Sequence, residues 1–421
     1  MTDDTALSRS GLSRRGLLGL TGAGVVGAGV GVAVDRFAIP AQASGNSGAA
    51  ASYPFYSKHQ SGVTTAAQDR LHFASYDVSD ISRNELIGLL KDWSYAAARM
   101  VEGKSIGDGA VDGPLDAPPD DTGEALDLPA AGLTITFGFG PSLFDERFGL
   151  ESQRPEALVD LPHFSGDALD ESLVGGDLCI QACSDDPQVA VHAIRNLSRI
   201  AFGRASIRWS QLGFGRTSST TRAQVTPRNL FGFKDGTANV KAEDTNQVEQ
   251  HVWVPKGDSA SWMTGGSYLV SRKIRMTIET WDRTALREQE RVIGRTKGEG
   301  APHSGGSEFT EPGFSAKKHG VPAIDDAAHI RLAHPKQNDG ALLLRRGYNF
   351  VDGNDDLGRL AAGLFFIAFQ RDPREQFIPI QLRLAKNDAM NEYLRHIGSG
   401  IFAVPPGATK GSYIGATLFE R

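Results

Sequence analysis

The chain is poor in cysteine: only Cys179 and Cys183 occur among its 421 residues. They lie four positions apart in a segment that we expect to be a strand, which separates their Cα atoms by about 13 Å. A disulfide cannot span that distance. A small scaffold held together by disulfides is therefore excluded, and we expect both thiols to be buried small side chains.

The sequence also lacks an excess of positive charge. It has 44 Lys and Arg against 50 Asp and Glu, a net charge of −6. Removal of residues 1–43 would leave 40 basic and 47 acidic residues. This balance argues against nucleic acid as the partner. The remaining length exceeds one typical hydrophobic core, so we expect two domains.

Long apolar runs are scarce, and the one at residues 16–34 contains seven glycines. Glycine is a poor helix former, so an uncleaved membrane anchor is the weaker interpretation, although the run is nearly long enough to span. The run follows Arg14-Arg15 and precedes the small residues Ala41-Gln42-Ala43. This order predicts a cleaved signal at 1–43, recognised by the twin-arginine (Tat) export machinery. The mature protein would then be extracellular, periplasmic or associated with the cell envelope.

The pattern beyond the signal predicts an α+β fold. Residues 44–58 are rich in Ala, Ser and Gly and predict a flexible segment. Residues 59–222 follow a β-α-β-β-α-β order, and 104–129 is an acidic, proline-containing surface insertion. We expect strands near 71–78, 133–137, 178–182 and 206–214, with helices that begin at the capping box Ser82/Glu85 and at Asp186-Pro187. The strands at 133–137 and 178–182 alternate in polarity and should be half-buried.

Residues 223–421 repeat this order more loosely. We expect strands at 274–278, 342–350, 363–369 and 401–404, a helix capped by Asp282 that includes Leu286 and Ile293 and ends near Gly294, and a helix through Phe377, Ile380 and Leu384. The fold class is therefore α+β, with two ferredoxin-like domains that have antiparallel sheets. The loop at 297–326 is long for a compact domain, and such loops are usually functional.

Three segments carry side chains suited to chemistry. They are Gly232-Phe233-Lys234-Asp235-Gly236-Thr237, Ala327-Ala328-His329-Ile330-Arg331-Leu332 and Leu344-Arg345-Arg346-Gly347. Together they can bring a carboxylate, an imidazole and a guanidinium to one pocket. A haem peroxidase needs an iron ligand, a group that moves the peroxide proton and a cation for developing negative charge.

These segments resemble the dye-decolorising (DyP-type) peroxidase family, in its Gly-x-x-Asp-Gly signature and in the His-to-Arg spacing that follows it. The resemblance covers most of the chain beyond residue 60. Within the family, the chain is similar to the deferrochelatase/peroxidase branch. It implies one haem b (iron protoporphyrin IX) per chain, held in the C-terminal half. It also implies oxidation of dyes, phenols or other bulky aromatic substrates by hydrogen peroxide through a ferryl intermediate. The alternative is a haem-binding iron-uptake protein that releases iron from haem.

The resemblance makes His329 the proximal iron ligand. His334, followed by Pro335, is the nearest competing imidazole; the family often has an uncharged amide at this place, so we expect His334 to line the haem edge. A carboxylate behind the ligand makes the imidazole more basic. Asp388 is the candidate for that carboxylate and Glu392 is the alternative, unless both lie on a solvated helix face.

Asp235 is the expected distal acid–base group, although Asp-Gly is also a common turn dipeptide. Gly236 would supply a positive φ and let the backbone approach the haem, with Thr237 and Ala238 beside it. Arg345 follows His329 by 16 residues and matches the family's distal arginine. Because neighbouring residues of a strand face opposite sides, Arg346 should point away from the haem.

Other roles stay open in the sequence. Arg295 is a candidate partner for a haem propionate, since a guanidinium suits a carboxylate. Candidate relays for electron transfer to the surface are Trp253, Trp262, Trp281, Tyr348 and Tyr393, although plain packing is the commoner role of such side chains. A homo-oligomer is also compatible with the sequence.

Overall fold

The computed structural model describes residues 52–420. The predicted signal at 1–43, and residues 44–51 of the predicted flexible segment, lie outside the described residues. The remainder of that segment is packed rather than flexible, because Phe55 is buried and meets the ring of Phe137 edge-on. Among residues 52–420, no helix is long and apolar enough to cross a membrane.

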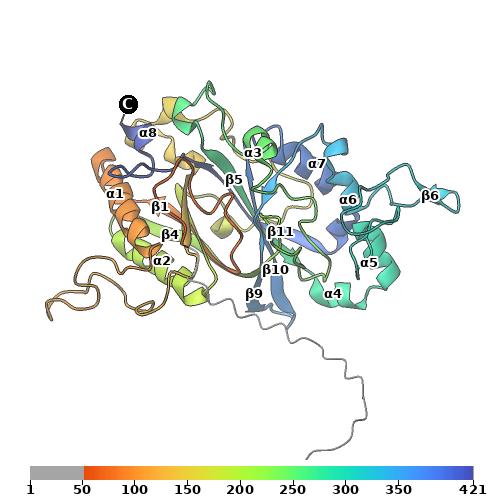
Figure 1. The fold of residues 1–421 in the computed structure, drawn as a ribbon, viewed down its shortest axis with the longest axis horizontal. Coiled ribbons are helices and arrows are strands. Elements are labelled where there is room, and N and C mark those ends of the chain that lie inside the picture. Colours follow the sequence, from red (N-terminus) through yellow and green to blue (C-terminus); the bar gives the residue numbers. More distant parts are fainter. Residues whose placement is uncertain (1–51, 421) are drawn as a thin grey trace, which may run out of the picture. The chain divides into compact units, whose positions relative to one another are not determined.

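The first half of the described chain has the predicted β-α-β-β-α-β order (Figure 1). Ser82 accepts a hydrogen bond from the Glu85 N–H while Glu85 accepts one from the Ser82 N–H, so the predicted capping box is present. Asp186 caps the second helix. The elements are β1 (Arg70–Val78), α1 (Arg83–Met100), β2 (Thr134–Phe139), β3 (Leu178–Ser184), α2 (Pro187–Ile200) and β4 (Ala205–Arg216).

The second half has the same succession with additional short elements. These are α3 (Thr245–His251), β5 (Ser267–Met276), α4 (Ile278–Arg283), α5 (Leu286–Ile293), β6 (Lys317–Lys318), β7 (Val321–Pro322), α6 (His329–Leu332), β8 (Leu344–Arg345), β9 (Tyr348–Asn354), β10 (Leu360–Gln370), α7 (Phe377–Asn387), β11 (Leu394–Val404) and α8 (Ala416–Phe419). The strand predicted at 342–350 is divided into β8 and β9, because the chain leaves the ladder at Arg346 and Gly347.

The prediction of one helix that is capped by Asp282 and ends near Gly294 was partly wrong. Asp282 lies inside α4 and caps nothing, while α5 begins after Ala285. Ile278 belongs to α4 rather than to the preceding strand. Leu286 is exposed, whereas Ile293 is buried. The end of α5 is as predicted, since Gly294 has a φ of +89°.

The strands of both halves join in one antiparallel sheet. The neighbours run β2-β3-β1-β4 in the first half and β11-β5-β10-β9 in the second. The halves meet at both edges, where β11 pairs with β2 and β4 pairs with β9. With the β5–β10 pairing the sheet closes on itself. The boundary predicted between residues 222 and 223 falls in the connection from β4 to α3.

Closure of the sheet explains why the half-buried prediction for two strands was wrong. Every residue of β2 and β3 is buried. Their apolar side chains pack beneath α1 and α2. Polar side chains on the other face form hydrogen bonds with the segment that precedes β1. Thr136 donates to the Ser61 carbonyl (2.7 Å) and Gln181 donates to the Gly62 carbonyl (3.0 Å). The two cysteines are buried and unpaired, as predicted.

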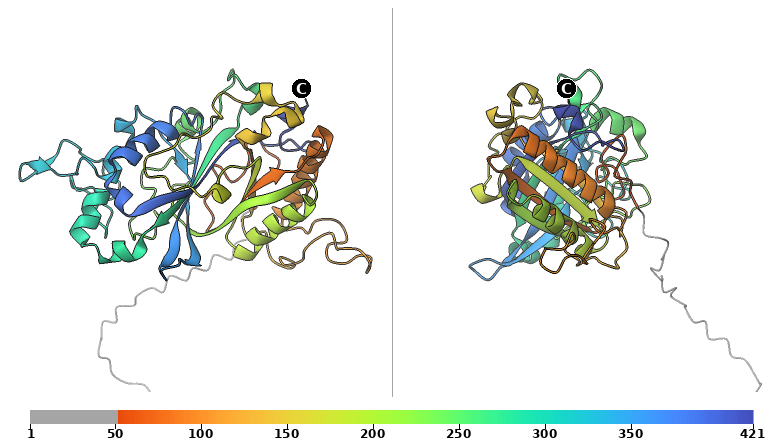
Figure 2. Two further views of the ribbon diagram at one scale, coloured as in Figure 1. Left: turned by 180° about the vertical axis from the view of Figure 1, so that it is seen from behind. Right: turned by 90° about the vertical axis from the view of Figure 1, so that its left-hand side faces the viewer.

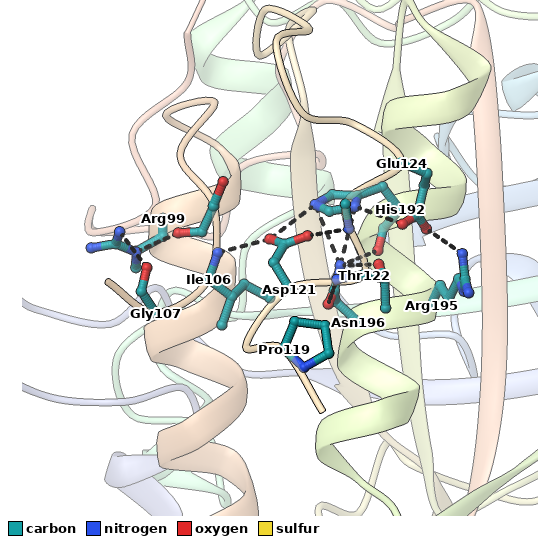
Figure 3. A network of polar contacts seen from close by, with 12 residues as sticks. Arg99, Ile106, Gly107, Pro119, Asp121, Thr122, Glu124, His192, Arg195 and Asn196 are labelled. Atoms are coloured by element: carbon teal, nitrogen blue, oxygen red, sulfur yellow. Dashed lines mark hydrogen bonds and ion pairs between the residues drawn. The ribbon is translucent and has the colours of Figure 1, made fainter. Parts of the chain in front are cut away.

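The acidic insertion at 104–129 has neither helix nor strand but is fastened to α2 (Figure 3). His192 of α2 lies between two carboxylates, with Nε2 3.6 Å from Asp121 and Nδ1 3.4 Å from Glu124. Asn196 donates to the Thr122 hydroxyl (2.8 Å). These contacts hold the base of the insertion in place while most of its side chains face solvent.

Helices α1 and α2 cover one end of the closed sheet, and α5, α6 and α7 gather at the other end (Figures 1 and 2). The loop at 297–326 lies at this second end and carries only the short β6–β7 hairpin. It leads directly into α6, whose first residue is His329. The three segments singled out in the sequence therefore converge at the second end.

Candidate active site

A pocket opens between β5, β10, α6 and α7. Its apolar walls come from side chains that include Ile274, Met276, Phe366 and Leu384. The polar lining comes from segments far apart in the chain. It includes Asn229, Lys234, Asp235, Gly236, Thr237, Arg272, Arg295, His329, His334, Arg345, Gln381, Asp388, Asn391 and His396. Such a mixture of apolar walls and a few convergent polar groups is typical of a ligand site.

On one side of the pocket, His329 is held by Asp388. The His329 Nδ1 lies 2.6 Å from the Asp388 Oδ2. The other oxygen of Asp388 accepts the Met390 N–H (2.8 Å), which fixes the carboxylate at the end of α7. Because a carboxylate can only accept here, Nδ1 carries the proton and Nε2 keeps its lone pair.

The electrostatics of His329 favour a basic imidazole. Burial alone would lower the pKa of His329, but the Asp388 carboxylate more than offsets this and raises it. No partner for Nε2 is present among residues 52–420. The side chain is 34% exposed, and as a lining residue it exposes that surface to the pocket. An imidazole with one nitrogen anchored and the other free suits a metal.

In the same pocket, Asp235 pairs with Arg345. The Arg345 Nη1 donates to the Asp235 Oδ1 at 3.0 Å. The two groups act on the pKa of His329 in opposite directions, the carboxylate raising it and the guanidinium lowering it. The acid, the cation and the imidazole therefore share one pocket.

Gly236 makes the turn that presents Asp235. Its φ is +83°, a backbone conformation that residues other than glycine rarely adopt. A Cβ at this position would also lie 2.9 Å from the Ser218 Cα. The predicted turn is therefore present, and the same turn carries the carboxylate that faces the pocket.

Arg345 and Arg346 point in opposite directions, as strand geometry predicted. Arg346 is fully buried away from the pocket. Its guanidinium donates to the Thr65 carbonyl (2.6 Å), the Ala66 carbonyl (3.3 Å) and the Gln68 side chain. It thereby ties the N-terminal segment to the sheet.

Comparison with known proteins agrees with this arrangement. Profiles described as "Dyp-type peroxidase, N-terminal" and "Dyp-type peroxidase, C-terminal" match residues 60–215 and 226–409. A dye-decolorizing peroxidase of Thermobifida fusca is 39% identical over 375 residues, which cover 86% of this chain and 84% of that protein. A deferrochelatase of Yersinia pseudotuberculosis is 37% identical over 373 residues, covering 87% and 85%. The structure titled "Ferric DtpA from Streptomyces lividans" has a TM-score of 0.81 at 40% identity and covers 89% and 98%.

The chain belongs to the DyP-type peroxidase family. Membership implies a peroxidase with a haem cofactor and hydrogen peroxide as its substrate.

The pocket of this DyP-type chain fits a haem. One imidazole nitrogen is free to bind iron, and the apolar walls suit a flat macrocycle. On the pocket wall, the fully buried Arg272 is paired with Asp167. The Arg272 Nε is buried and has no partner among residues 52–420. Such a guanidinium N–H suits a carboxylate substituent.

The remaining predicted residues lie in the same pocket, but some are already engaged. His334 is the clearest case: its Nδ1 accepts the Lys336 N–H (3.2 Å) and its Nε2 lies 3.4 Å from Glu311. Burial lowers the pKa of His334. Unlike His329, it has no unengaged ring nitrogen, and its expected place at the haem edge stays a prediction. Pro335, Thr237 and Ala238 also line the pocket, and the Thr237 hydroxyl donates to Glu308 (3.3 Å).

Arg295 stands on the pocket wall, where its Nη1 holds the long loop. It donates to the carbonyls of Gly300 and Glu308, both at 2.7 Å. Burial lowers the pKa of Arg295. Glu308 also pairs with Lys234, next to Asp235. The loop is therefore bound to the segment that carries the distal carboxylate, and propionate pairing by Arg295 stays a prediction.

The sequence left Asp388 and Glu392 as alternatives for the carboxylate behind His329. Asp388, rather than the exposed Glu392, contacts His329. The candidate relay side chains are all buried. Among them, Trp281 and Tyr393 meet edge-on with centroids 5.0 Å apart and pack on side chains of the pocket wall. Their role in electron transfer stays a prediction.

Two site residues were missed in the sequence. Asn229 donates to the free oxygen of Asp235 (3.1 Å). Asn239 brackets Arg345, accepting its N–H (2.7 Å) and donating to its carbonyl (2.9 Å). Both asparagines flank the Gly-x-x-Asp-Gly signature. However, an asparagine near a turn commonly bonds its own backbone, so the sequence offered no signal for these contacts.

Proposed function

We propose that this protein is a haem b peroxidase, with one haem per chain in the C-terminal half, that uses hydrogen peroxide to oxidise dyes, phenols or other bulky aromatic substrates. The observation that carries the proposal is the Asp235–Arg345 pair, which lines the same pocket as the Asp388-bound His329. Iron binding alone needs only the histidine. An acid–base group and a cation in the same pocket are what peroxide cleavage requires in addition.

Each residue has a distinct part in this reaction. The haem supplies the redox chemistry of O–O bond cleavage. His329 binds the iron through Nε2, while Asp388 accepts the Nδ1 proton and keeps the ring oriented. Asp235 takes the proton from one peroxide oxygen and returns it to the other. Arg345 stabilises the negative charge that develops on the departing oxygen.

Absorption spectroscopy tests this proposal directly. The purified protein should show a haem spectrum that changes on addition of one equivalent of hydrogen peroxide and returns when a phenol or dye is added, with the substrate oxidised. A protein that binds haem but neither reacts with peroxide nor oxidises an aromatic substrate would contradict the proposal.

We expect Asp235→Asn to bind haem normally and to react 10- to 10³-fold more slowly with peroxide, the usual contribution of a general base. The amide keeps the size of the side chain but cannot accept the proton. Stopped-flow mixing with peroxide measures the rate. Asp244→Asn is a matched control, because Asp244 is paired with Arg222 outside the pocket and its removal should leave the rate unchanged. An unchanged rate in Asp235→Asn would leave Asp235 as a turn residue.

Release of iron from haem is the second candidate function. It is favoured by the relative named deferrochelatase, at 37% identity. The two functions need the same pocket but give different products. Incubation of the haem-loaded protein should yield intact porphyrin and free iron if the second function holds. Oxidised aromatic product with the haem retained supports the first.

We also propose that the protein is exported by the Tat machinery, on the basis of Arg14-Arg15 and the apolar run that follows. Replacement of both arginines by lysine should leave the protein in the cytoplasm, because this machinery reads the arginine pair. Cell fractionation measures the distribution. Export of the lysine variant at the normal level would contradict the signal assignment.

A further inference from the structure

Asn229 contacts the distal carboxylate on the side opposite to Arg345. Its Nδ2 donates to the Asp235 Oδ2 at 3.1 Å, while Arg345 donates to Oδ1 at 3.0 Å. Both oxygens of the carboxylate are therefore engaged by donors, one neutral and one charged. Asn229 also lines the pocket.

The orientation of the Asn229 amide is fixed by its other hydrogen bond. The Asn229 Oδ1 accepts the N–H of Phe231 at 3.0 Å. An amide has one acceptor oxygen and one donor nitrogen. The flipped amide would lose the Phe231 bond and place two oxygens in contact, so only the orientation with Nδ2 toward Asp235 satisfies both neighbours.

The turn that carries Asn229 is anchored in an aromatic cluster. The Asn229 carbonyl accepts the Gly232 N–H (2.9 Å), which closes the turn. The Phe231 ring stacks on Trp281 with centroids 4.3 Å apart, and the Phe231 carbonyl accepts from the indole N–H (3.0 Å). The amide is thus positioned by buried packing that does not depend on Asp235.

We propose that Asn229 is a positioning residue of the distal site, whose amide orients the Asp235 carboxylate for the transfer of the peroxide proton. This role rests on the proposed peroxidase function, in which Asp235 moves the peroxide proton. A donor to a carboxylate stabilises the charged form over the neutral form. The bond also leaves one lone pair of Oδ2 for the incoming proton, because a carboxylate oxygen has two.

Two variants separate this role from simple packing. Asn229→Leu keeps approximately the size of the side chain and removes both hydrogen bonds. Asn229→Asp keeps the acceptor for Phe231, and therefore the turn, but replaces the donor by a second carboxyl group. Asn354→Leu is the matched control, because Asn354 is exposed on β9 away from the pocket.

Infrared spectroscopy of the resting, haem-loaded protein measures the effect independently of turnover. The carboxylate bands of Asp235 are identified by subtraction of the Asp235→Asn spectrum. In both Asn229 variants these bands should shift in frequency, because Oδ2 has lost its amide donor. The Asn354→Leu protein should show the bands of the wild type. Unshifted bands in both Asn229 variants overturn the proposal.

The rate of reaction with peroxide gives the second readout. The rate should fall in both Asn229 variants and stay at the wild-type value in Asn354→Leu. In the Asp235→Asn background, Asn229→Leu should cause no further loss, because a positioning residue acts only through its target. Additive losses overturn the proposal.

These readouts also separate the inference from the function on which it rests. Shifted carboxylate bands in a protein that does not react with peroxide would reject the peroxidase function while supporting the contact from Asn229 to Asp235. Normal peroxide reactivity with unshifted bands would reject the role of Asn229 alone.

Discussion

His329→Ala should abolish haem retention, because it removes the imidazole that Asp388 holds through Nδ1 and that lines the pocket with its Nε2 unengaged. The variant should fold, since the His329 side chain is not part of the apolar core. The ratio of haem absorbance to protein absorbance after purification, with haem supplied in the medium, measures retention. We expect a value near zero, against one haem per chain for the wild-type protein.

The matched control for His329 is His334→Ala, which removes the other imidazole that lines the same pocket. Both ring nitrogens of His334 are already engaged, one by the Lys336 N–H and the other by Glu311. We therefore expect this variant to retain haem and to change activity only modestly. Loss of haem in the His334 variant, with normal haem in the His329 variant, would reverse the assignment of the ligand.

Local features of the fold could be predicted because they depend on neighbouring residues. The capping box at Ser82 and Glu85 joins residues three positions apart. The opposite directions of Arg345 and Arg346 follow from the geometry of a strand. The positive φ of Gly236 follows from the turn that its Asp-Gly dipeptide favours. In each case the interaction that decides the structure lies within a few residues of chain.

Features that depend on sheet closure could not be predicted in this way. The alternating pattern of β2 and β3 indicates one polar face, but the polar face is covered by a segment about seventy-five residues earlier in the chain, as the Thr136–Ser61 bond shows. Leu286 fits the periodicity of one predicted helix. In the structure the residues before it belong to a separate helix, α4, and Leu286 at the start of α5 is exposed. Burial in these places is decided by tertiary contacts that no local pattern encodes.

The same distinction applies to the candidate site. The family resemblance identified His329, Asp235 and Arg345, and the structure places all three around one pocket. It also gave Asp388, which contacts His329, as a candidate, but it did not identify the residues that hold Asp235 and Arg345. Asn239 contacts the backbone of Arg345 across 106 positions of chain. Such supporting contacts have no fixed spacing, so they emerge only when the chain is folded.

Arg345→Leu should slow the reaction with hydrogen peroxide by at least about 10²-fold, by comparison with the loss of single charge-stabilising donors elsewhere. The guanidinium lines the pocket but does not hold His329, which is bound by Asp388, so haem retention should be unaffected. Arg345→Lys keeps the positive charge but loses the planar set of donors, and it should react at an intermediate rate. Stopped-flow spectroscopy at matched haem concentration measures all three proteins.

Arg346→Leu is the control that tests the direction of each side chain. Arg346 is fully buried and supplies hydrogen bonds to Thr65, Ala66 and Gln68. Its removal leaves the buried Gln68 Oε1 without its donor, and one unsatisfied buried group costs about 1–3 kcal/mol. We therefore expect a lower unfolding temperature but a near-normal rate with peroxide per bound haem. Equal kinetic losses in the two leucine variants would show that the reaction depends on the integrity of this strand and not on the guanidinium that faces the pocket.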